Sequence, residues 1–169
     1  MKINDLMILD DEQIDYDTLS EEQLHQLVYS DNLFIATSAL IELRFRNKIL
    51  AALSASYILS KSSGDCYLQA AAIETLFQTN PYGIAMDYMK KLDGTCHPYI
   101  LNSIMEIIME NLSDFQSEIG SKVTQIIYDI VQSLTGGDEF IDSEVKSKFF
   151  NWYSEDKKLR SNLIVHYVA

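Results

Sequence analysis

Residues 64–92 read GDCYLQAAAIETLFQTNPYGIAMDYMKKL, and the fold prediction starts from this stretch. An apolar pattern with three consecutive alanines stops at Asn80 and Pro81, and a second apolar pattern then begins. Proline disfavours helical backbone at the residue before it and suits the first turn of a following helix. The stretch therefore predicts two helices joined by a short connection.

The first of these two helices recurs along the chain. LFIATSALIELRFRN (33–47) aligns with CYLQAAAIETLFQTN (66–80), and PYILNSIMEIIMENL (98–112) continues the alignment. The matched apolar positions are Phe34, Tyr67 and Tyr99; Ile35, Leu68 and Ile100; Ala39, Ala72 and Ile104; Leu40, Ile73 and Met105; and Leu43, Leu76 and Ile108. Their spacing predicts that they share one face of a helix in each copy.

An amphipathic segment follows each copy. These segments read ILAALSASYILSK (49–61), YGIAMDYMKKL (82–92) and FQSEIGSKVTQIIYDIVQSL (115–134), the last with an apolar stripe of Ile119, Val123, Ile126, Ile127, Ile130 and Leu134. Small residues in the middle of the first helices, such as Ala70, Ala71 and Ala72, allow a neighbouring helix to approach closely. Each repeat is therefore predicted to be a helical hairpin, at about 31–61, 64–92 and 97–134.

One further unit is predicted at each end of the repeats. An acidic segment and cap occupy residues 1–30, where Ser20 and Gln23 form a capping box. A second cap occupies 143–169, as a helix pair at about 143–155 and 157–168. The sequence thus predicts an all-α protein with a single domain over 1–169: a short, right-handed α-solenoid of helical hairpins with capping helices at both ends.

The net charge of the 169-residue chain is −12, and it is unevenly distributed. Residues 1–31 hold nine acids and one lysine, and residues 62–145 hold thirteen acids and three lysines. Such a field repels nucleic acid and anionic lipid and speeds encounter with a basic partner. The start of the chain lacks the pattern of a secretory signal or a membrane span, so we expect a cytoplasmic location.

The segment SDNLFIATSALIEL (30–43) resembles the first helix of a short HEAT-like repeat, of the kind found in bacterial proteins related to phycobilisome-lyase repeats. The resemblance covers about residues 30–134. In size, acidity and repeat type the chain also resembles the immunity proteins of bacterial polymorphic and contact-dependent growth-inhibition toxin systems. This second resemblance implies a toxin inhibitor, which would bind a basic secreted toxin domain, a nuclease by expectation, and cover its active site.

Two other functions stay open at this point. A HEAT-like scaffold or adaptor in a larger assembly would use the same surface for protein–protein interaction without a toxin. The third alternative is an enzyme or cofactor-handling repeat protein, such as a lyase-like or DNA-glycosylase-like one, and it is disfavoured. A glycosylase requires a basic groove to bind DNA, whereas this chain is acidic.

The candidate motifs for catalysis and metal binding lack residues or spacings that the chemistry requires. DEQIDYDTLSEE (11–22) places acids at calcium-loop positions, but Tyr16 occupies the position where the loop needs glycine. The three histidines have no ligand spacing, and Cys66 and Cys96 are predicted to be reduced structural thiols. We therefore predict that the protein is not an enzyme and has no catalytic residue, metal site or cofactor.

The predicted function instead requires a partner-binding surface. The second helices of solenoid hairpins line the concave face, so their acids are candidates, together with those of the loop after Gly136 and Gly137. Trp and Tyr dominate interface hot spots, which adds aromatic candidates, although Trp152 also suits the core of the last hairpin. The predicted partner-binding residues are Tyr82, Asp87, Glu118, Gln125, Asp129, Asp138, Glu139, Phe140, Asp142, Trp152 and Tyr153.

Overall fold

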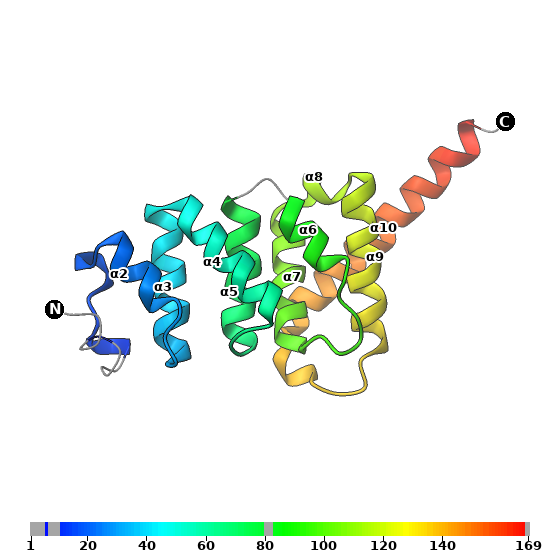
Figure 1. Ribbon diagram of the computed structural model, residues 1–169. Helices are drawn as coiled ribbons and strands as arrows, with labels where there is room; N and C mark the ends of the chain where they lie inside the picture. The colour runs from blue at the N-terminus through cyan, green and yellow to red at the C-terminus, as the bar shows by residue number, and fades with distance from the viewer. Residues whose placement is uncertain (1–5, 7–10, 80–82, 168–169) are drawn as a thin grey trace. The chain divides into compact units, whose positions relative to one another are not determined.

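The computed structural model describes Leu6, residues 11–79 and residues 83–167, and this part of the chain is helical without a β-strand (Figure 1). None of the helices searched there is both long and apolar enough to cross a membrane. The all-α prediction is confirmed. Two compact units make up the chain, Met1–Tyr88 and Met89–Ala169, and each is described by itself. The single solenoid domain stays a prediction.

The first unit is built around three long helices. The connection between α3 (Leu33–Arg46) and α4 (Lys48–Lys61) is a single residue, and α5 (Cys66–Thr79) packs against both. Ahead of them come two short 3₁₀ turns, η1 (Asp11–Gln13) and η2 (Tyr16–Thr18), and the helix α2 (Glu21–Leu27), which contacts α3 and α4. The helix α6 (Gly83–Met89) ends at the boundary of the unit.

The second unit is organised around α7 (Pro98–Glu110). This helix contacts α8 (Leu112–Phe115), α9 (Glu118–Ser133) and α10 (Ser143–Tyr167), as well as the 3₁₀ turn η3 (Asp138–Phe140). Phe115, Val123, Ile127 and Phe149 are fully buried and form the core with the apolar face of α7.

Burial confirms most of the repeat alignment. Four of the five matched positions are buried in α3, and their counterparts in α5 and α7 are buried too. In α3 these positions are Ile35, Ala39, Leu40 and Leu43. The prediction that Phe34 and its counterparts share this buried face is wrong, because Phe34 is 75% exposed and Tyr67 is 47% exposed. This position lies one residue before that of Ile35, so a step of 100° turns it away from the buried face.

The helix boundaries predicted at Ser20 and Asn47 are confirmed. Asn47 ends α3, where its N–H bonds to the carbonyl of Leu43, and also caps α4, because its side chain accepts from the N–H of Leu50. Ser20 and Gln23 form the predicted capping box. The stop at Asn80 and Pro81 lies outside the described residues, between the ends of α5 and α6.

The stripe predicted for the third hairpin is wrong in part. Gln116 and Ser117 interrupt the segment 115–134, so that α9 begins only at Glu118 with Ser117 as its cap. Ile119 is 51% exposed, whereas Gly120 and Thr124 join Val123 and Ile127 on the buried face. The buried stripe therefore contains small and polar residues that an apolar pattern does not select.

The helix pair predicted for 143–169 is also wrong. A single helix, α10, runs from Ser143 to Tyr167. Residues 155–158 read EDKK and contain neither glycine nor proline, so nothing in the local sequence ends the helix there.

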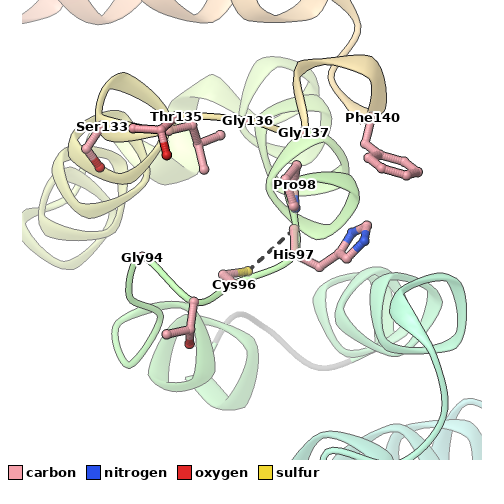
Figure 2. A pocket seen from close by; sticks show the side chains of 11 residues that line it. Gly94, Cys96, His97, Pro98, Ser133, Thr135, Gly136, Gly137 and Phe140 are labelled. Carbon is pink, nitrogen blue, oxygen red and sulfur yellow. Dashed lines mark hydrogen bonds between the residues drawn. The ribbon is translucent and has the colours of Figure 1, made fainter.

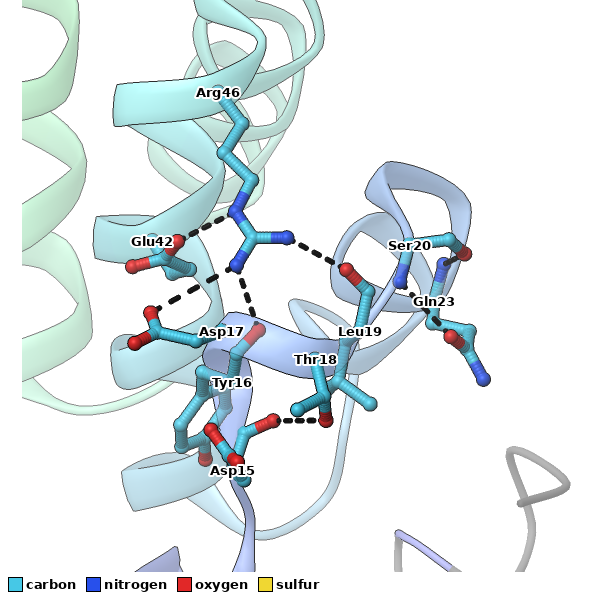
Figure 3. A network of polar contacts seen from close by, with 9 residues as sticks. All are labelled: Asp15, Tyr16, Asp17, Thr18, Leu19, Ser20, Gln23, Glu42 and Arg46. Carbon is cyan, nitrogen blue, oxygen red and sulfur yellow. Dashed lines mark hydrogen bonds and ion pairs between the residues drawn. The ribbon is translucent and has the colours of Figure 1, made fainter.

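The side chain of Arg46 binds the acidic segment that precedes α2 (Figure 3). The Arg46 guanidinium donates to the carbonyl of Leu19 at 2.6 Å and to the carbonyl of Tyr16 at 2.9 Å. Its Nε donates to Glu42 at 2.6 Å, and Asp17 lies 3.9 Å away. These contacts fasten the segment that resembles a calcium loop to α3.

Candidate partner-binding surface

The acids predicted on α9 lie at the surface of the second unit. Glu118 is paired with Lys122 at 2.8 Å, and this cation holds the pKa of the Glu118 carboxyl below its usual value. Asp129 accepts a hydrogen bond from Gln125 at 2.8 Å. Both carboxylates are exposed, so each remains reachable by a partner although each already has a neighbour.

The aromatic residues predicted on α10 are less exposed than a surface anchor requires. Tyr153 is buried, its ring stacks on Tyr128 at a centroid distance of 4.3 Å, and its hydroxyl donates to Gln125. Trp152 is half-buried near Phe149, with ring centroids 6.5 Å apart. The structure corrects the assignment of Tyr153: its ring packs inside the unit rather than facing a partner.

The residues predicted around η3 have mixed roles. Glu139 is exposed, and Phe140 is 38% exposed with its ring edge-on to His97 at 4.9 Å. Asp142 caps α10 by accepting from the N–H groups of Glu144 and Val145 at 2.7 and 2.9 Å. The described side chains here thus include one structural cap and two solvent-facing groups; the side chain of Asp138 lies outside the described part.

The remaining predicted residues belong elsewhere. Tyr82 lies outside the described residues, and Asp87 is an exposed residue of α6 in the first unit. Because the other described members of the set belong to the second unit, the gathering of all of them into one acidic groove stays a prediction.

An open hollow of about 620 Å³ lies in the second unit, between the segments 94–98 and 133–140 (Figure 2). Among the lining residues that the structure describes, Phe140 is the one that belongs to the predicted set, and none carries a carboxylate. His97 Nδ1 accepts from the N–H of Tyr99 at 3.2 Å, which leaves Nε2 to carry a proton. The described lining of this hollow therefore does not supply the predicted acidic groove, which stays a prediction.

The thiol beside this hollow is expected to be unreactive. Burial raises the pKa of Cys96 to about 12, and the Asp93 carboxylate adds to the shift. Because the thiolate is the nucleophile, alkylation of Cys96 by iodoacetamide at pH 8 should be about two to three orders of magnitude slower in the folded protein than in urea. A Cys66→Ser variant isolates Cys96 for this measurement. A folded-state rate within tenfold of the rate in urea would contradict the expectation.

Possible metal ligands stay apart in the described residues, where no three His, Cys, Asp or Glu side chains form a group that could hold an ion. In the calcium-like segment, Asp17 faces Arg46, and the main chain of η2 is held by the same guanidinium. Asp17 therefore has a cation of the chain itself as neighbour.

Sequence reasoning missed an exposed apolar row in the first unit. Ile49, Leu53 and Tyr57 stand at i, i+4 and i+8 of α4 and are 76%, 61% and 50% exposed. Tyr29, which follows α2, continues the row, because its ring meets that of Tyr57 at 5.7 Å. The signal was present in the sequence: ILAALSASYILSK has large apolar residues on more than one face, which a helix buried on one side does not need.

Comparison of the chain with protein-family models, with curated proteins and with solved structures gave no match.

Proposed function

We propose that the chain is an immunity protein that binds a basic toxin domain of the nuclease class in the cytoplasm and covers its active site. The observation that supports this proposal best is the excess of negative charge, −12 over 169 residues, with Glu118, Asp129 and Glu139 at the surface. Nucleases bind a polyanion, so their substrate clefts carry positive potential. An acidic surface can occupy such a cleft in place of phosphate.

The proposed architecture is a short, right-handed α-solenoid of HEAT-like hairpins. The equivalent burial of the repeat slots in α3, α5 and α7 supports it, because stacked repeats bury corresponding positions against their neighbours. In this architecture α2 and α10 cap the stack, and the second helices α6 and α9 present their outer faces to the toxin.

The test is binding and rescue with the toxin domain encoded beside the chain. We expect the chain to protect cells that express the toxin, and we expect association to slow about tenfold or more between low and high salt, because long-range attraction is screened. A double variant, Asp129→Lys with Glu139→Lys, should weaken binding at low salt, whereas Asp129→Asn with Glu139→Gln should weaken it less. Equal killing with and without the chain would contradict the proposal.

A scaffold function predicts a different result in the same experiment. Purification of the chain from its own cells would then recover a multi-subunit assembly, and the chain would leave every candidate toxin active.

A further inference from the structure

We infer that the exposed apolar row of α4 and Tyr29 docks an amphipathic α-helix of another protein, with basic residues on the flank that faces α2. This inference stands apart from the toxin proposal, because it concerns the first unit and a helical ligand of any origin.

The row is long enough for a helical ligand. Ile49 and Tyr57 lie eight residues apart on α4, about 12 Å at 1.5 Å per residue. A partner helix that presents apolar side chains at i, i+4 and i+7 covers about 10.5 Å, and one more contact at i+11 extends it past the row. Each of the three side chains is at least half exposed, so their burial is available to stabilise a complex.

The row is also pre-organised. Two hydrogen bonds place α2 alongside α4 in the same chain direction: Asn47 Nδ2 donates to Glu21 at 2.7 Å, and the hydroxyl of Tyr29 lies 3.3 Å from that of Ser54. The ring of Tyr29 is held edge-on between His25 and Tyr57, at 5.5 and 5.7 Å. Aromatic side chains that are held in place before binding lose little conformational freedom in a complex.

The charged residues around the row favour a partner helix with basic residues. Glu21 and Glu22 are exposed on α2, and the hydrogen bond from Asn47 sets Glu21 beside the start of α4. The first 31 residues carry nine acids and one lysine. Lys48 and Lys61 are exposed at the two ends of α4, next to Ile49 and one turn beyond Tyr57. A partner helix with lysine or arginine toward α2 therefore meets opposite charge. A second copy of the chain does not fit as well, because it brings a net charge of −12.

The test uses synthetic 15-residue helices and fluorescence anisotropy. One peptide has leucine at i, i+4, i+7 and i+11 with lysine along one flank. A second replaces the lysines by glutamate, and a third replaces the leucines by serine. We expect the first peptide to bind at least about tenfold more tightly than either of the others, and to shift amide NMR signals at residues 25–29 and 49–57.

Variants of the protein locate the site. Leu53→Ser and Tyr57→Ala should each weaken binding about tenfold, and Glu22→Lys about threefold. Ile119→Ser, at a residue of α9 that is 51% exposed, serves as the matched control and should change binding less than twofold. The variants replace exposed side chains, so circular dichroism should show an unchanged helical content.

Three results would overturn the inference. Equal or tighter binding of the glutamate peptide would show that the partner helix needs no basic residues toward α2. Shifts of NMR signals outside the row would show that the peptide binds elsewhere on the protein. Dimerisation of the protein that rises with concentration and is abolished by Leu53→Ser would show that a second copy occupies the row. Failure of toxin rescue leaves the inference untouched, because the peptides report on the row alone.

Discussion

Gly120→Ala is expected to destabilise the second unit by about 3 kcal/mol. A Cβ at this position of α9 would lie 2.7 Å from the carbonyl oxygen of Asp114 and 2.8 Å from the carbonyl carbon of Phe115. These are backbone atoms, which cannot rotate away, so α8 and α9 must separate. Glycine to alanine within a helix ordinarily stabilises by about 0.5–1 kcal/mol, so the expected sign is opposite to helix propensity.

The measurement is urea unfolding, combined with hydrogen exchange of the α9 amides. Gly83→Ala is the matched control: Gly83 also belongs to a helix, α6, and a Cβ there would meet none of the described residues within 4 Å. We expect this control to be neutral or slightly stabilising. A Gly120→Ala protein as stable as the wild type would show that α8 and α9 are not packed as closely as described.

Arg46→Ala is expected to lower the free energy of unfolding of the first unit by about 2 kcal/mol and to release the segment ahead of α2. The substitution removes donors from the carbonyls of Tyr16 and Leu19 and breaks the pair with Glu42. Hydrogen bonds from a charged donor are stronger than neutral ones, so the loss of two of them is costly. Hydrogen exchange of residues 16–20 should therefore accelerate more than that of α3.

Two conservative variants separate the contributions. Arg46→Lys keeps the charge but cannot reproduce the fork that reaches both carbonyls, so most of the effect should remain. Glu42→Gln leaves those carbonyls bonded and removes only an ion pair four residues apart on α3, which should cost less than about 0.5 kcal/mol. If the glutamine variant is as damaging as the alanine variant, the ion pair rather than the carbonyl contacts holds the segment.

The repeat face was predictable because its signal is local. Ile35, Leu68 and Ile100 occupy equivalent slots, and all three are buried as the periodicity indicates. The helix ends at Ser20 and Asn47 were predictable for the same reason, since a cap is formed within three residues of the chain. Phe34 lies one residue before the buried position Ile35, and this single step turns its side chain from the core to the solvent.

The candidate site was less predictable, because exposure depends on which segments meet. Tyr153 was expected at a surface, but its ring stacks on Tyr128 of another helix. The apolar row on α4 was not anticipated, because a run of apolar residues does not say which of its faces a neighbour leaves open.

The amino-acid sequence by itself determined that the chain is helical, where most of its helices begin and end, and which face of each repeat is buried, because these follow from contacts within a few residues. Only the tertiary structure decided that Arg46 binds a main-chain segment 27 and 30 residues away, that Gly120 must remain without a side chain, and that Ile49 and Leu53 face solvent. The physical reason is that each of these depends on the approach of segments that no local pattern relates to one another.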